Sequence, residues 1–182
     1  MKIKLQNVRL SFPNLFTAKA GDDGGEAKFS AGFLIDPKDK QIQMIEDAMK
    51  QVAKDKWGAK WEQVYKSMAA SDKLALHDGD SKAQYAGYEG MMFINANNAT
   101  RPLILDRDKS ALSAEDGKPY GGCYVNVSLD LWAQDNKFGK RINAGLGGVQ
   151  FVKDGDAFGG GTKGDESDFD ELGDGADASD LV

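Results

Sequence analysis

The clearest pattern in the chain is a strict alternation of apolar and polar residues between Cys123 and Trp132. Every second side chain in this segment is aliphatic or small and apolar, which is typical of a half-buried strand. A loop over residues 134–139 joins it to another strand over residues 140–152, where glycines would allow curvature. The pattern therefore predicts an antiparallel hairpin in the second half of the chain.

A strand is also predicted over residues 2–12, but its apolar phase changes midway. Ile3 and Leu5 occupy odd positions, whereas Val8 and Leu10, with Phe12 after them, occupy even ones. Because a strand has a period of two residues, this change requires a bulge or sharp bend near positions 6 and 7. Bends of this kind let one strand serve two faces, as small closed barrels require.

Two further strands are predicted, over residues 28–35 and 91–96, and a helical insertion over about residues 38–70 separates them. Apolar residues recur in the insertion at spacings of three and four, and Gly58 divides it into two helices. Five strands with helices inserted after the second predict a mainly β (α+β) fold. A five-stranded Greek-key barrel of the OB-fold type fits this order.

The C-terminal stretch differs sharply in charge from the rest. The whole chain of 182 residues has a net charge of −6, but residues 154–182 alone carry −9 and residues 1–153 carry +3. Glycine and aspartate dominate the stretch, and its few large apolar residues cannot offset the entropy of ordering it. The sequence therefore predicts a barrel domain over residues 1–153 and a disordered acidic tail over 154–182.

The composition argues against several other classes. The single cysteine, Cys123, excludes an internal disulfide and favours the cytoplasm, and with one histidine it leaves no zinc-binding set. No apolar run approaches the roughly 18 residues of a membrane span. We therefore expect no metal, no cofactor and no contact with a membrane.

No group of residues supports catalysis. His77 is the sole histidine available as a base, and a lone histidine in a polar loop is most simply a solvated side chain. Asp106, Asp108 and Glu115 could serve a metal-dependent nuclease, but they follow no standard spacing. A non-enzymatic protein is expected.

Aromatic and basic residues gather in and around the predicted hairpin. Stacking of bases on aromatic faces, with cations along the phosphates, is how proteins hold single strands. A second interpretation stays open, in which Tyr124 packs under the helices and Trp132 caps the barrel. The candidate DNA-binding residues are Tyr124, Trp132, Phe138, Lys137, Lys140, Arg141, Arg101, Tyr120 and Phe93.

Three segments carry a resemblance to a known family. They are Met92-Phe-Ile-Asn-Ala-Asn97 followed by Arg101-Pro102, residues 119–125 (PYGGCYV), and residues 145–150 (GLGGVQ) followed by Asp154-Gly155. In this order they resemble a family of bacteriophage single-stranded DNA-binding proteins, over about residues 2–161. The resemblance implies an OB-fold core, binding of single-stranded DNA with little sequence preference, and a role in phage DNA replication or recombination inside the infected cell.

The tail has two expected roles besides raising solubility. A flexible polyanion could occupy the basic groove until nucleic acid displaces it. The resemblance implies that the tail also meets partner proteins, although this chain ends in Leu-Val where the best-known tails end in phenylalanine. The candidate partner-binding residues are Phe169, Asp170, Glu171, Asp180, Leu181 and Val182.

A function of another class stays open beside DNA binding. The chain could be a non-enzymatic adaptor that uses its exposed aromatic residues and its tail to bind proteins. Such an adaptor would show little dependence on salt and no quenching of tryptophan by oligonucleotides. The sequence also leaves open whether several copies assemble.

Overall fold

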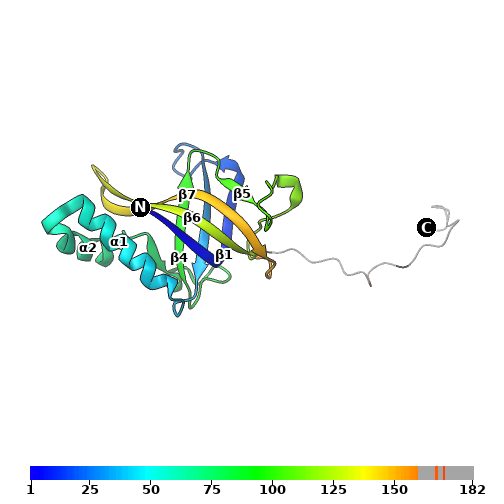
Figure 1. Ribbon diagram of the computed structural model, residues 1–182, viewed down its shortest axis with the longest axis horizontal. Coiled ribbons are helices and arrows are strands. Elements are labelled where there is room, and N and C mark those ends of the chain that lie inside the picture. Colours follow the sequence, from blue (N-terminus) through cyan, green and yellow to red (C-terminus); the bar gives the residue numbers. More distant parts are fainter. Residues whose placement is uncertain (160–166, 168–169, 171–182) are drawn as a thin grey trace.

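The structure is a computed structural model that describes residues 1–159, 167 and 170. Within this part, a curled β-sheet forms a barrel and two helices lie at one of its ends (Figure 1). The helices are α1 (Gln41–Trp57) and α2 (Trp61–Ala70). The strands are β1 (Lys2–Lys19), β2 (Lys28–Ile35), β3 (Leu76–Asp78), β4 (Met92–Asn98), β5 (Leu103–Leu105), β6 (Tyr124–Asn136) and β7 (Gly139–Lys153).

The strand order is β3-β4-β2-β1-β6-β7-β5, and β4 also pairs with β7. This last pairing is parallel, joins Asn97 to Gly145, and closes the sheet on itself. The five long strands β1, β2, β4, β6 and β7 thus make the expected closed barrel with inserted helices. The three-residue strands β3 and β5 were not predicted, because segments this short have no readable period.

The predicted bend in β1 is confirmed. The pairing of β1 with β6 shifts register between Leu5 and Val8, and Asn7 lies in the left-handed region with a φ of 53°. Asn126 of β6 accepts the Asn7 backbone N–H through its side-chain oxygen at 3.0 Å. The bulge keeps apolar residues on the inner face on both sides of the break.

The expectation that Phe12 shares this inner face is wrong. The pairing of β1 with β2 is irregular between Ser11 and Asn14, and Phe12 has a φ of 44° and an exposed side chain. Ser11 is buried instead, and its hydroxyl accepts a hydrogen bond from the Tyr88 hydroxyl at 3.0 Å. A second change of phase follows the first, and it turns the Phe12 ring outward.

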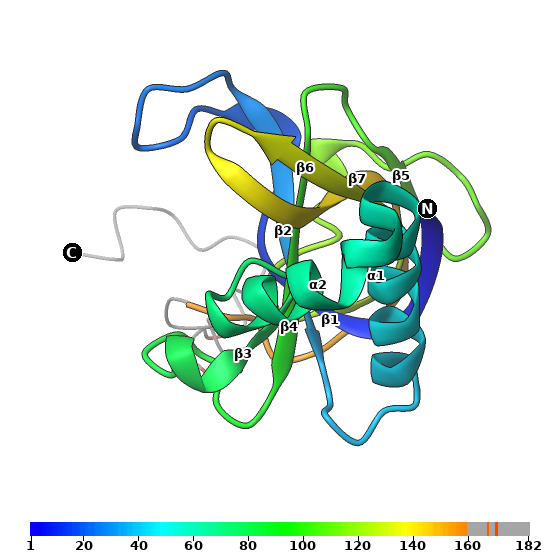
Figure 2. The same ribbon diagram turned by 90° about the vertical axis from the view of Figure 1, so that its left-hand side faces the viewer.

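The helices cover one end of the barrel (Figure 2). Ile45, Met49 and Val52 of α1 are buried, as their spacing predicts, and Met68 is the buried residue of α2. Residues 79–90 cover part of the outer face of the barrel, where Leu34, Tyr88 and Phe93 form a small second core. Farther along β4, Asn95 and Asn97 of the same face are exposed. None of the described helices combines the length and apolarity needed to cross a bilayer.

Contacts with the barrel continue past the boundary expected at residue 153. Arg9 donates to the backbone oxygens of Gly122 and Asp156 at 3.0 and 2.8 Å, and its guanidinium carbon lies 4.2 Å from the centre of the Phe158 ring. Phe158 also packs on the second core. Residues 154–158 thus belong structurally to the barrel. Of the tail candidates, Asp170 is described and exposed, whereas Phe169, Glu171, Asp180, Leu181 and Val182 lie outside the described residues.

The left-handed conformation at the β1 bulge predicts which substitutions it tolerates. Replacing Asn7 by valine should lower the free energy of unfolding by about 1–2 kcal/mol, because a β-branched residue is disfavoured at positive φ. Glycine has no such penalty, so Asn7→Gly should unfold close to wild type. Urea denaturation measures both. Equal stability of the valine and glycine variants would contradict the bulge.

Candidate nucleic-acid interface

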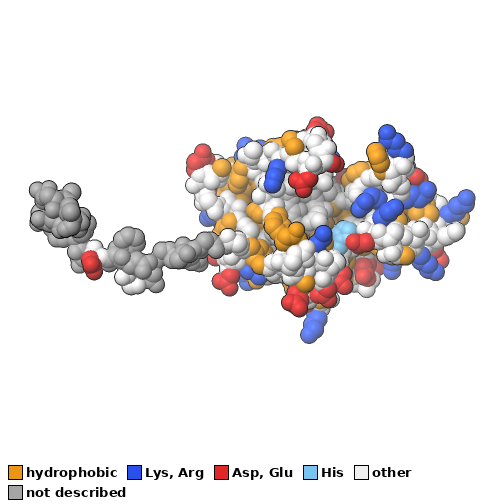
Figure 3. Space-filling model, turned by 180° about the vertical axis from the view of Figure 1, so that it is seen from behind, with side chains coloured by type: hydrophobic (Ala, Val, Ile, Leu, Met, Phe, Trp, Pro, Cys, Tyr) orange, Lys and Arg blue, Asp and Glu red, His pale blue; other side chains and the backbone are white. Residues whose placement is uncertain are grey.

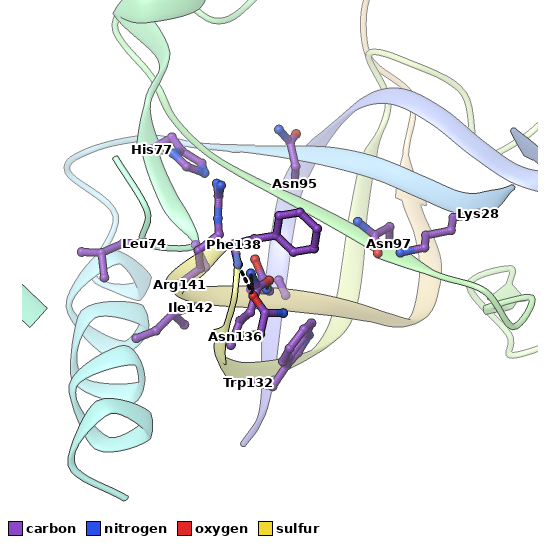
Figure 4. Close-up of a pocket in the computed structure, with 14 residues that line it drawn as sticks. Lys28, Leu74, His77, Asn95, Asn97, Trp132, Asn136, Phe138, Arg141 and Ile142 are labelled. Atoms are coloured by element: carbon purple, nitrogen blue, oxygen red, sulfur yellow. Dashed lines mark hydrogen bonds between the residues drawn. The ribbon is translucent and has the colours of Figure 1, made fainter. Parts of the chain in front are cut away.

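A groove of about 490 Å³ opens between the β6–β7 hairpin and the outer face of β2 and β4 (Figure 4). The hairpin supplies aromatic, amide and guanidinium groups, and the barrel wall supplies amides and an ammonium group. His77 of β3 lies at one end. The groove is lined by Trp132, Gln134, Asn136, Phe138, Arg141 and Asn143 on the hairpin and by Lys28, Asn95 and Asn97 on the wall.

Strand alternation sets which hairpin side chains face the groove. Trp132 pairs with Asn143 and Gln134 pairs with Arg141, so these four side chains share one face. Asp135 lies on the other face and accepts a hydrogen bond from the Trp57 indole of α1 at 3.0 Å. The helix thus holds the back of the hairpin while the front stays open.

Two aromatic rings stand free on this front face. The side chain of Trp132 is 47% exposed and that of Phe138 is 73% exposed. The Phe138 backbone N–H donates to the Asn136 side chain at 2.9 Å, which fixes the tip, and Lys137 lies 5.1 Å from the Phe138 ring centre. Large apolar rings left in water beside cations have the composition of a base-stacking surface.

The opposite wall of the groove is polar. In β4, Ile94 and Ala96 point into the barrel, so Asn95 and Asn97 point outward into the groove, and Lys28 joins them from β2. None of the described residues that line the groove carries a carboxylate. Lys and Arg side chains gather toward the helical end of the same face (Figure 3). Lys28 and Arg141 in this lining would attract a phosphodiester backbone.

His77 was expected to be a solvated loop residue, and the structure corrects this. The residue is part of β3, and its Nδ1 lies 2.7 Å from Asp72 Oδ1. Its ring packs 5.1 Å from the ring of Phe93 and also lines the groove. Lys28, Asn95 and Asn97 were also missed. Alternation in β4 could have found the two asparagines, whereas His77 and Lys28 reach the groove only through tertiary contacts.

The predicted residues do not all meet in this groove. Trp132, Phe138 and Arg141 line it, and Lys137 flanks it. Lys140 points to the back of the hairpin, with its ammonium 3.5 Å from Asp135. Arg101 is not among the lining residues, and its guanidinium carbon lies 5.6 Å from the Phe16 ring centre.

Tyr124 and Tyr120 lie at the other end of β6. Tyr124 pairs with Lys153, whose ammonium is 4.8 Å from its ring centre. The Tyr120 hydroxyl donates to Asp154 at 2.6 Å, and this bond raises the pKa of the phenol. Phe93 is only 3% exposed under residues 79–90. Its ring has no face open to a base, so we remove it from the DNA-binding set.

The carboxylates weighed for a nuclease have other partners. Asp106 forms an ion pair with Lys118 at 3.0 Å, and Asp108 accepts the Ser110 hydroxyl. The pKa of Asp106 is lowered first by the backbone N–H of Arg107, and that of Asp108 first by Ser110. Within residues 1–159, 167 and 170, no three histidine, cysteine or acidic side chains are grouped to hold a metal ion.

Comparison with known proteins decides the family. The family model of the single-stranded DNA-binding protein of Enterobacter phage Enc34 matches residues 1–182. The chain belongs to this family. A protein of Acyrthosiphon pisum secondary endosymbiont phage 1, p50, is 46% identical over 176 residues, which are 94% of each chain. The resemblance seen in the sequence is thereby confirmed.

Solved structures agree with this membership. The single-stranded DNA-binding protein of bacteriophage Enc34 in complex with single-stranded DNA is 35% identical and superposes with a TM-score of 0.75, over 87% of this chain and 89% of the other. The single-stranded DNA-binding protein gp2.5 of bacteriophage T7 is 13% identical, with a TM-score of 0.60 over 90% of this chain and 98% of its own. The second likeness shows a shared fold alone.

The contact between Asp135 and α1 can be tested through its acidity. The pKa of Asp135 lies below its ordinary value, first because the Trp57 indole donates to the carboxylate and next because Lys140 is near. Removing the indole in Trp57→Phe should therefore raise this pKa toward its ordinary value. Side-chain carboxyl shifts in an NMR titration report it.

Trp61→Phe is the matched control, because Trp61 lies near the same helix junction but its indole does not donate to Asp135. This variant should leave the titration of Asp135 unchanged. The same low pKa in wild type and in Trp57→Phe would show that the helix does not hold the hairpin in this way.

Proposed function

We propose that this protein binds single-stranded DNA without sequence preference and protects it during phage DNA replication or recombination in the infected cell. The observation that carries the proposal is the pair of free rings, Trp132 and Phe138, above a groove whose described lining has no carboxylate. A solved relative that binds single-stranded DNA, 35% identical to this chain, supports it.

The proposed binding mode follows from the two walls of the groove. Bases stack on Trp132 and Phe138, and such stacking tolerates any sequence because every base has a π-face. The amides of Asn95 and Asn97 can donate or accept, so they suit varied base edges and phosphates. Lys28 and Arg141 in the groove, Lys137 beside it and Arg101 outside it neutralise phosphates. Each adds roughly 0.7 to the salt slope for a single strand.

Removing the rings should weaken binding. Trp132→Ala and Phe138→Ala should each cost about 1–3 kcal/mol of binding free energy per stacked base. Trp132→Phe should lose less, because it retains an aromatic face. Anisotropy of a labelled oligo-dT measures the affinity without relying on protein fluorescence.

Lys4→Gln supplies a control on a separate surface formed by β1, β5, β6 and β7. Lys4→Gln should reduce the affinity for oligo-dT less than Arg141→Gln, because Arg141 lines the groove and Lys4 does not. Wild-type affinity in both alanine variants, with their folds intact, would refute the stacking model. Absence of any binding by the wild-type chain would favour the protein adaptor.

The acidic tail is proposed to compete with DNA and to recruit replication or recombination proteins. Support comes from the charge of −9 in residues 154–182 against +3 in the rest of the chain. A tethered polyanion has a high effective concentration near a basic groove. Asp180-Leu181-Val182 at the end would offer a partner an apolar contact beside an acid.

Truncation tests this competition, and the structure shows where to cut. The chain should end at Gly159 and not at Lys153, because Arg9 and the second core hold residues 156–158. The shortened protein should bind oligo-dT more tightly than the full chain at low salt. The difference should shrink as salt rises, since screening weakens the tail first. Equal affinities at all salt concentrations would rule out competition by the tail.

A further inference from the structure

We propose that Phe12 and Tyr85 form a second stacking platform for single-stranded DNA, beyond the groove between the hairpin and β4. The inference rests on the proposed function and extends the path of the same strand. It assigns these two residues to contact with bases that have already passed Trp132 and Phe138.

The two rings are exposed and in contact with each other. Phe12 is 57% exposed and Tyr85 is 42% exposed. Their ring centres are 5.1 Å apart with an interplanar angle of 82°, so the two rings form an edge-to-face contact. Both rest on the buried Tyr88, at ring-centre distances of 6.1 and 5.9 Å. The pair is held in place from below while its outer surface faces water.

The backbone holds the Phe12 ring outward at a conformational cost. A φ of 44° is unfavourable for a bulky side chain, and residues in such conformations concentrate at binding sites. The core does not require this arrangement, because Ser11 fills the buried position and bonds to Tyr88. What the conformation achieves is the presentation of an aromatic face next to Tyr85.

A continuous aromatic layer connects the platform with the groove. His77 lines the groove and packs on Phe93, with ring centres 5.1 Å apart. Phe93 packs on Tyr88 at 5.1 Å, and Tyr88 packs on Tyr85. The face of the molecule that carries His77 also displays hydrophobic side chains at its surface (Figure 3).

Gly32 of β2 is buried and lets a side chain of the groove and one below the platform meet above it. A Cβ at this position would lie 3.1 Å from the Asn95 side-chain oxygen and 3.1 Å from the Tyr88 hydroxyl. Asn95 belongs to the groove, and Tyr88 supports the platform. The groove wall and the support of the platform are therefore adjacent over β2, so a strand that leaves the groove over Asn95 comes next to the rings that rest on Tyr88.

The platform contributes rings without a cluster of cations. Near Tyr85, Asp78 accepts the backbone N–H of Asp80, Asp80 accepts that of Gly90, and Glu89 is exposed. The segment that carries Tyr85 adds Lys82 as a single base. Loss of the platform should therefore lower affinity for long strands without changing the salt slope, which phosphate contacts determine.

The experiment compares oligo-dT of about 4 and about 16 nucleotides, the range that OB-folds occupy. The variants are Phe12→Gly, which suits the positive φ, and Tyr85→Ala. Each should bind the long oligonucleotide about 5- to 150-fold more weakly per lost stack and the short one as wild type does. Tyr85→Phe should keep wild-type affinity, and Met44→Ala is the control for an exposed apolar residue on α1.

Urea denaturation establishes that each variant is folded, and Phe12→Asn replaces Phe12→Gly if the glycine variant is not. Wild-type affinity of the folded platform variants for the long oligonucleotide would overturn the platform. If Trp132→Ala then bound both the short and the long oligonucleotide more weakly, the groove would be supported as a DNA-binding site and the platform would not. A loss confined to the platform variants, with Trp132→Ala unaffected, would keep the platform and refute the groove.

Discussion

The β6–β7 hairpin extends beyond the barrel as two paired strands, and its alternation divides its side chains between two tasks. One face carries Asp135, which binds the Trp57 indole and lies near Lys140, so the helices and the hairpin are held together. The other face carries Trp132, Gln134 and Arg141 toward β4. A shift of register by one residue would exchange the two faces, so the pairing of β6 with β7 determines whether a groove exists at all.

Closure of the barrel imposes a second requirement on the outer surface. The parallel pairing of Asn97 with Gly145 brings β4 beside β7, so the amides of β4 face the hairpin across a narrow gap. Residues 79–90 cover the part of this wall that contains Leu34 and Phe93. Next to it, the exposed Asn95 and Asn97 form a short strip of amides, with the rings of Trp132 and Phe138 across the groove. Such a strip suits a flexible polymer whose bases repeat along its length.

Local patterns in the sequence were sufficient for much of this architecture. The bulge at Asn7, the helices and the hairpin each depend on a period that can be read within about ten residues, and each is confirmed. Phe93 illustrates the limit of such reasoning. Alternation places it on the outer face of β4, but its burial depends on a covering segment with no period of its own.

In the candidate site, too, some residues could be found from local sequence patterns and others depend on tertiary contacts. Trp132, Phe138 and Arg141 could be selected because strand phase and loop position are local properties. Tyr124 shares the phase of Trp132, yet it lies at the far end of β6, beside Arg9 and Lys153. His77 and Phe12 escaped detection because their positions depend on β3 and on an irregular stretch of β1. Phase alone identifies a face, and tertiary contacts decide which part of that face is open.

The central claim is that single-stranded DNA lies between the hairpin and β4. Photo-crosslinking of an oligo-dT that carries 5-iododeoxyuridine, followed by mass spectrometry of the peptides, tests it most directly. The account predicts crosslinks at Trp132 and Phe138, since these rings are the most exposed in the groove. Crosslinks confined to Tyr120 and Tyr124, at the opposite end of β6, would contradict it.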